Sequence, residues 1–156
     1  MSACLALIRH AEAGKRERWK GDDRLRPLSK KGRRQALALV DALASVPIQR
    51  VLSSPYVRCV QSVEPLAHAR RLPVEQSEAL AEGAGLEAML ALVRELAGAS
   101  AALCTHGDLM DEATDMLVAR GVIRPQQVRY QKGGTWLVEE EGGRLLAARY
   151  VPAPVV

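Results

Sequence analysis

The stretch CLALI at residues 4–8 is apolar throughout and is followed at once by Arg9 and His10. A short apolar run that ends at charged residues has the length and composition of a strand buried inside a sheet. Outward from it, short apolar segments at 50–53, 73–76 and 101–105 alternate with helical patterns at 29–44, 54–69, 86–97 and 108–119. This alternation predicts βα units around a largely parallel sheet.

Local signals mark where two of these helices begin. Ser29 is predicted to cap the first helix, with Gly32 in its first turn, and Ser54 followed by Pro55 predicts the start of the second. Residues 134–139 and 144–150, joined by Glu-Glu-Gly-Gly, are typical of a hairpin. Residues 11–28 show no period and carry much of the charge, which favours a long functional loop.

The composition excludes several classes of protein. With 156 residues, 48% apolar and 26% charged, we expect one globular domain over residues 1–156. No apolar run approaches the ~20 residues of a membrane span, and the N-terminus lacks the pattern of a signal peptide, so we expect a cytoplasmic location and no membrane partner. The three cysteines lack the spacing of a disulfide scaffold or a zinc site.

Positive charge is concentrated near the N-terminus. Between Arg9 and Arg34 there are eleven Lys or Arg and four acidic residues, whereas the whole chain has a net charge of +4. Such a patch fits a solvated face, a nucleic-acid footprint or the field around a site for an anionic substrate. The chain has no Phe, two Trp and three Tyr, which argues against a base-stacking surface.

Polar residues follow three of the predicted strands directly. Arg9-His10 follows the first, the stretch 53–58 with Arg58 follows the second, and His106-Gly107 follows the fourth. Because ligands bind at the carboxyl ends of parallel strands, two His and two Arg are predicted to converge on one edge of the sheet.

Four stretches carry a resemblance to a known family: LIRHAEAG (7–14), RPLSKKGRRQA (26–36), VLSSPYVRCVQS (51–62) and THGD (105–108). They resemble the histidine phosphatase superfamily, also called phosphoglycerate mutase-like. Within it, the chain looks most like SixA-type phosphohistidine phosphatases and the phosphatase domain fused to Nudix hydrolases. The resemblance implies a three-layer α/β/α fold with a mostly parallel central sheet and an antiparallel C-terminal edge.

The resemblance also implies catalytic roles. His10 would be the nucleophile that takes the phosphoryl group, while Arg9, Arg58, His106 and the neighbouring backbone at Gly107 would bind that group. Arginine suits this task because its planar, permanently charged fork binds two oxygens at once. The family usually has Gly where this chain has Ala11.

The general acid of the family corresponds here to Glu82, a candidate only, because the sequence continues with Gly83 and Gly85 instead of the usual L-x-E-x-x-x-G pattern. An imidazole leaving from phosphohistidine needs a proton less than an alkoxide does. A weak acid would therefore favour a phosphohistidine substrate.

We thus expect a phosphatase that needs no metal or cofactor and acts on a phosphohistidine protein, a nucleotide or a small phosphorylated metabolite. The alternatives are a phosphoglycerate mutase-like phosphotransferase and a non-enzymatic basic module that binds nucleic acid. A serine nucleophile at Ser53 or Ser54 lacks the G-x-S-x-G turn. Asp22, Asp23 and Asp108 lack the clustered pattern of a metal site.

Overall fold

A computed structural model describes residues 2–156 of the protein. The strands and α-helices are, in chain order, β1 (Ala3–Arg9), α1 (Lys30–Ala42), β2 (Arg50–Ser53), α2 (Val57–Ala69), β3 (Val74–Gln76), α3 (Leu86–Glu95), β4 (Ala101–Thr105), α4 (Gly107–Ala119), β5 (Thr135–Glu141) and β6 (Arg144–Val151). The 3-10 turns are η1 (Arg16–Arg18), η2 (Asp23–Leu25), η3 (Glu78–Leu80) and η4 (Pro125–Gln127). The α-helices among residues 2–156 have at most 13 residues, too few to span the apolar core of a bilayer.

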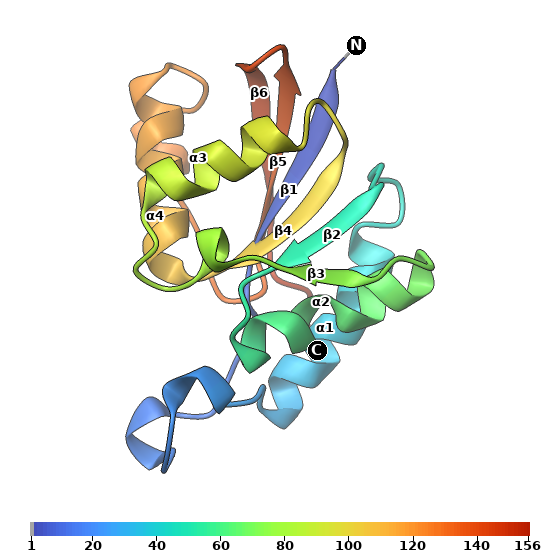
Figure 1. The fold of residues 1–156 in the computed structure, drawn as a ribbon, viewed down its shortest axis with the longest axis vertical. Coiled ribbons are helices and arrows are strands. Elements are labelled where there is room, and N and C mark those ends of the chain that lie inside the picture. The colour runs from blue at the N-terminus through green and yellow to red at the C-terminus, as the bar shows by residue number, and fades with distance from the viewer. Residues whose placement is uncertain (1) are drawn as a thin grey trace.

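The six strands form one sheet in the order β3-β2-β4-β1-β5-β6 (Figure 1). The first four strands of this order are parallel, while β5 runs antiparallel to β1 and β6 antiparallel to β5. Gly142 and Gly143 form the turn between β5 and β6 with φ values of 57° and 84°, a backbone conformation that suits a tight hairpin turn. The predicted fold class, with its antiparallel C-terminal edge, is confirmed.

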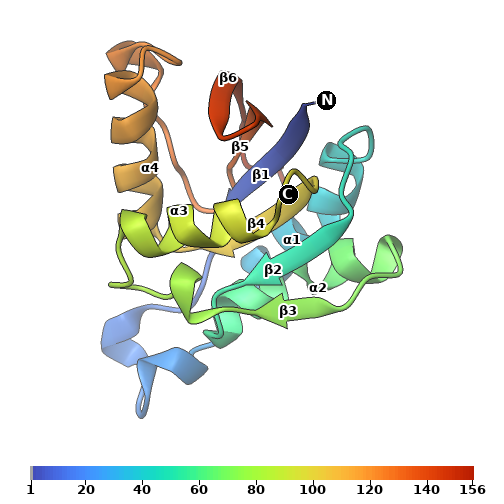
Figure 2. The same ribbon diagram turned by 45° about the horizontal axis from the view of Figure 1, so that its top comes forward.

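Helices cover both faces of the sheet, with α1 and α2 on one side and α3 and α4 on the other (Figures 1 and 2). Side chains of a strand point alternately to its two faces. Accordingly, Leu5 and Leu7 of β1 pack in the core with α3 and α4, whereas Ala6 and Ile8 pack with α1 and α2. The uninterrupted apolar run of β1 is thus explained by burial on both faces.

The start of α1 is fixed by the loop that precedes it. Ser29 caps the helix as predicted, its Oγ accepting a hydrogen bond from Gly32 N at 3.1 Å. The Ser29 backbone N–H also donates to Glu12 O at 3.0 Å. A Cβ atom on Gly32 would lie 1.9 Å from that same carbonyl oxygen. Only glycine permits this close approach of the helix to the loop.

The predicted start of α2 is wrong. Ser54 is not its cap, because the helix begins at Val57 with Tyr56 as the capping residue. The Ser54 hydroxyl lies 2.8 Å from His106 Nε2 and accepts a hydrogen bond from Tyr56 N at 3.2 Å. A buried imidazole needs a polar partner, and that tertiary contact takes the hydroxyl that the local pattern assigns to a cap.

The register of the parallel strands aligns their carboxyl ends. Arg9 of β1 lies opposite Thr105 of β4, and Ser53 of β2 lies opposite Cys104. The residues that follow these strands, among them His10 and His106, therefore lie at one edge of the sheet, as predicted.

Candidate active site

A cleft of about 870 Å³ opens at this edge. Its lining residues include some from the ends of β1 and β4, the start of α2, the segment after η3 and the loop 13–26. Every site residue expected from the sequence lines it: Arg9, His10, Arg58, Glu82, His106 and Gly107.

His10 is 6% exposed, and its ring Nδ1 lies 2.7 Å from Ala11 O. A carbonyl oxygen can only accept, so Nδ1 carries the proton and Nε2 keeps its lone pair. Burial, opposed by the Ala11 carbonyl and assisted by the neighbouring His106 and the positive charges of Arg58 and Arg9, lowers the pKa of His10 to about 3. The imidazole is therefore neutral at pH 7, the form that can act as a nucleophile.

The carbonyl that orients His10 is itself fixed. Ala11 N donates to Ser62 Oγ at 2.8 Å, and Ser62 Oγ donates to Arg58 O at 2.7 Å. His10 N donates to Thr105 O at 3.0 Å, which ties the start of the loop to β4. Residues from α2 and β4 thus hold the backbone of His10 and Ala11 in place.

Arg9 crosses the cleft toward the segment before β5. Its Nη1 donates to Tyr130 O at 2.9 Å, and its guanidinium carbon lies 5.8 Å from the centre of the Tyr130 ring. A Cβ atom on Gly107 would lie 2.7 Å from Arg9 Nη2. Glycine at position 107 is therefore needed for Arg9 to pack against the start of α4.

Arg58 is 1% exposed although it is charged. Its Nη1 donates to Asp23 O at 2.9 Å and its Nη2 to Asp23 Oδ2 at 3.1 Å. The guanidinium also lies 4.9 Å from the centre of the Tyr56 ring. A buried charge needs such paired, hydrogen-bonded partners.

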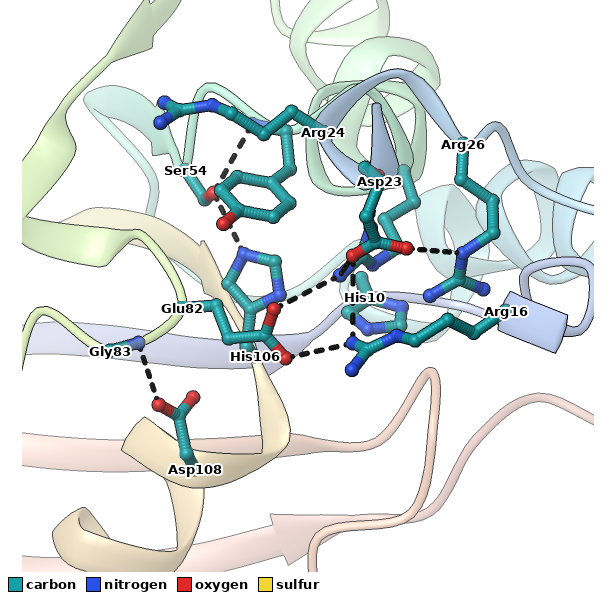
Figure 3. Close-up of polar contacts among 12 residues, drawn as sticks. His10, Arg16, Asp23, Arg24, Arg26, Ser54, Glu82, Gly83, His106 and Asp108 are labelled. Carbon is teal, nitrogen blue, oxygen red and sulfur yellow. Dashed lines mark hydrogen bonds and ion pairs between the residues drawn. The ribbon is translucent and has the colours of Figure 1, made fainter. Parts of the chain in front are cut away.

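His106 is 2% exposed and packs between two rings, with centroid distances of 4.5 Å to Tyr56 and 5.5 Å to His10. Its Nε2 lies 2.8 Å from Ser54 Oγ (Figure 3). It also lies 3.5 Å from the Sγ of the buried Cys59. Ser54 Oγ already accepts from Tyr56 N, so its own proton can be donated to Nε2. When the hydroxyl donates in this way, the ring proton of a neutral His106 lies on Nδ1.

Three buried nitrogen atoms of this cleft have no hydrogen-bond partner within residues 2–156: Arg9 Nε, Arg58 Nε and His106 Nδ1. Leaving a buried donor unpaired costs about 1–3 kcal/mol. Three such groups around one cleft, beside a neutral His10, are typical of a site that binds an anion with several oxygens.

Glu82 contributes a carboxylate to the same cleft. Its Oε1 lies 3.0 Å from Arg16 Nη2 and its Oε2 lies 3.7 Å from Arg58 Nη2 (Figure 3). The side chain is 36% exposed. Two guanidinium groups from different segments therefore hold the carboxylate at the rim of the site.

The structure also places residues in the cleft to which the sequence assigned no role. Arg16 and Arg26 line it, and the buried Arg26 donates from Nε to Asp23 Oδ1 at 2.9 Å and from Nη1 to Gly14 O. Arg26 belongs to the RPLS run, so the resemblance could have indicated it. Asp23 had no such signal, because its partner Arg58 lies 35 positions away.

The acidic residues considered as metal ligands have other partners. Asp23 binds arginines, Asp108 Oδ2 accepts from Gly83 N at 2.8 Å, and Asp22 Oδ1 accepts from Arg24 N at 2.9 Å. Across the part of the chain that the structure describes, three or more His, Cys, Asp or Glu side chains do not gather anywhere in a way that could hold a metal ion.

Comparison with known proteins agrees with this geometry. The sequence profile of the histidine phosphatase superfamily (branch 1) matches residues 5–89. The 8-oxo-(d)GTP phosphatase of Mycolicibacterium smegmatis is 35% identical over 157 aligned positions, which cover 95% of this chain and 48% of that protein. The chain therefore spans about half the length of this relative.

Solved structures share the fold. The SixA protein of Agrobacterium tumefaciens is similar with a TM-score of 0.78 and 20% identity, over 96% of this chain and 99% of that one. The protein histidine phosphatase SixA in complex with tungstate is similar with a TM-score of 0.73 and 22% identity. The match covers 95% of this chain and 94% of that one. The chain belongs to the histidine phosphatase superfamily, branch 1.

Proposed function

We propose that the chain is a metal-independent phosphatase that hydrolyses phosphohistidine or a phosphomonoester through a phosphoryl group carried on His10 Nε2. One observation carries this proposal. The neutral, buried His10 has its Nδ1 proton held by Ala11 O, in a cleft where Arg9, Arg58 and His106 keep donors that have no partner within residues 2–156.

The first step forms a bond between His10 Nε2 and phosphorus while the bond from phosphorus to the leaving atom breaks. Negative charge on the three remaining oxygens is stabilised by the guanidinium groups of Arg9 and Arg58 and by the Nδ1 proton of His106. The proton on Nδ1 of His10 stays there throughout, hydrogen-bonded to Ala11 O. Water then forms a bond to phosphorus while the bond between His10 Nε2 and phosphorus breaks. The protons of the water leave with the inorganic phosphate, which restores neutral His10.

The leaving group must take up a proton, and Glu82 is the candidate donor, because its carboxyl group lies at the rim of the cleft beside Arg58. An alkoxide requires this proton in the transition state, whereas imidazole leaving from a nitrogen–phosphorus bond requires it far less. The fold shared with SixA supports phosphohistidine as the substrate, and the size of the cleft also suits a nucleotide or a small phosphorylated metabolite.

A substrate panel tests the proposal. We expect the wild type, assayed with EDTA present, to hydrolyse a phosphohistidine peptide with a higher kcat/KM than an alkyl phosphate. Glu82→Gln should slow alkyl phosphate hydrolysis by about 100-fold or more and spare the phosphohistidine peptide and an aryl phosphate, because only the alkyl ester needs a protonated leaving group. Glu78→Gln is the matched control, since Glu78 is exposed and pairs with Arg24 outside the cleft.

Three results would count against parts of this account. Activity that vanishes with EDTA and returns with Mg²⁺ or Zn²⁺ contradicts the metal-independent mechanism. Equal losses on all three substrates in Glu82→Gln remove Glu82 as the acid. A wild-type preference for the alkyl phosphate contradicts phosphohistidine as the substrate and leaves a small-molecule phosphatase.

A further inference from the structure

The carboxylate of Asp23 is surrounded by three arginines (Figure 3). Its Oδ1 accepts from Arg26 Nε at 2.9 Å, and its Oδ2 lies 3.1 Å from Arg58 Nη2 and 3.5 Å from Arg16 Nη2. The backbone oxygen of the same residue accepts from Arg58 Nη1 at 2.9 Å. One residue of the loop thus contacts every arginine that lines this side of the cleft.

These contacts determine which donors Arg58 presents. Both of its terminal nitrogens bind Asp23, so its orientation is fixed at two points, while its Nε has no partner within residues 2–156. Arg26 differs from Arg58 because it binds Asp23 through its Nε. The side chains of Arg58 and Arg26 are 1% and 9% exposed, so water does little to screen their mutual repulsion.

The loop in turn fixes Asp23. Asp23 is the first residue of η2, and the Asp22 side chain caps that turn by accepting from Arg24 N at 2.9 Å. Burial alone would raise the pKa of the Asp23 carboxyl, but Arg26, Arg58 and Arg16 together hold that pKa below its usual value. The carboxylate is therefore charged at neutral pH.

We propose that Asp23 is a positioning residue of the phosphatase site, which holds the guanidinium group of Arg58 in the orientation that binds the phosphoryl group and keeps Arg26 paired beside it. This inference rests on the proposed function. Donors fixed before the reaction stabilise the transition state without having to reorganise. A carboxylate between two buried cations also keeps them close when the cleft holds no anion.

The test compares Asp23→Asn with Asp22→Asn, which removes the same charge from the same turn. Asn at position 22 keeps an oxygen for Arg24 N, and Asp22 does not line the cleft. We expect Asp23→Asn to lower kcat/KM for an aryl phosphate and the affinity for orthovanadate by about 10-fold or more each, as loss of hydrogen bonds to charged groups does. Asp22→Asn should change both by less than about 2-fold, and Asp23→Glu, which restores the charge, should recover part of the loss.

A double variant shows whether Asp23 acts through Arg58. In an Arg58→Ala background, Asp23→Asn should cost clearly less than it does in the wild type, because residues that work through one contact are not additive. If Asp23→Asn lowers kcat/KM and vanadate affinity by the same factor in both backgrounds, the inference is overturned. Unchanged or tighter vanadate binding in Asp23→Asn would overturn it as well. Circular dichroism of each variant checks the fold.

Failure of this inference can be told apart from failure of the proposed function. A wild type that turns over phosphorylated substrates, with Asp23→Asn equally active, contradicts only the positioning role. A wild type without turnover contradicts the proposed function, while vanadate binding still measures the effect of Asp23 on the anion site. A wild type that neither turns over nor binds vanadate contradicts both.

Discussion

His10 is kept neutral by burial and by the positive charges around it, and it is oriented by a carbonyl of the next residue. The Ala11 carbonyl holds Nδ1 at 2.7 Å, and Ser62 fixes the Ala11 backbone. Many catalytic histidines are oriented by a carboxylate, which would favour the protonated ring. A backbone carbonyl instead sets the tautomer while adding no negative charge, and this leaves the lone pair on Nε2, the atom that we propose attacks phosphorus.

The depressed pKa of His10 predicts a specific dependence of stability on pH. Above pH ~6.5 His10 is neutral in both the folded and the unfolded state, so its ionisation does not lower the free energy of unfolding there. As the pH falls toward about 3, the unfolded chain takes up a proton that the folded protein does not. The free energy of unfolding should then fall by up to ~1.4 kcal/mol per pH unit from this group.

Urea unfolding of the wild type and His10→Gln at pH 7.5 and pH 5 measures how much of the pH-dependent loss in the free energy of unfolding comes from His10. The wild type should lose about 2 kcal/mol more than the variant between the two pH values, since the slope of ~1.4 kcal/mol per unit acts over roughly 1.5 units. Equal losses in the two proteins would show that His10 titrates like an ordinary histidine.

Sequence reasoning succeeds for residues that follow strands and fails for those that act across long separations. Arg9, His10 and His106 could be placed because the carboxyl end of a parallel strand has a known position. Ser54 was misassigned, because the same hydroxyl suits a helix cap and a buried imidazole, and only the tertiary structure decides between them. Asp23 could not be assigned, since its effect depends on Arg58 from another element.

Among the elements, α1 depends on its close contact with the loop 11–28. The helix was predictable from its cap and its apolar face, but the contact between Gly32 and Glu12 was not, because it joins two segments 20 positions apart. The buried strands were predictable because both of their faces are apolar, whereas η1 and η2 show no periodic pattern that a sequence could reveal.

Gly32→Ala should therefore destabilise the protein even though alanine favours helices. The added Cβ would meet Glu12 O at 1.9 Å. We expect a loss of about 2 kcal/mol or more from this overlap, which outweighs the ~1 kcal/mol that alanine gains in a helix. Gly14→Ala is the control, since its Cβ would meet nothing within 4 Å. Thermal unfolding of both variants checks the prediction, and equal stability would refute it.

For the whole molecule, the strand order explains why the candidate site residues gather at one edge of the sheet. The central strands β1, β4 and β2 are neighbours and parallel, so the residues after them meet without any long insertion. The loop 11–28 then covers this edge and brings Arg16 and Arg26 to the cleft, where both pair with Asp23 of the same loop. Positive charges of the loop are balanced by Asp23 and Glu82 beside the cleft and by Glu78 outside it.

The convergence of the strand ends could be predicted from the order of elements and the sheet class. The ion pairs that connect the loop to the strand ends could not, because they depend on how a segment without periodicity folds over the sheet. The basic patch consequently had several interpretations in the sequence, whereas in the structure part of it lines the candidate active site.

The measurement that tests the central claim most directly is detection of the phosphorylated enzyme. The protein is mixed with a phosphorylated substrate, quenched under alkaline conditions that preserve nitrogen–phosphorus bonds, and mapped by mass spectrometry. We predict one phosphoryl group on His10, which is lost together with turnover in His10→Ala and retained in His68→Ala, a change of an exposed histidine outside the cleft. A phosphoryl group on another residue, or full turnover in a folded His10→Ala variant, would contradict the account.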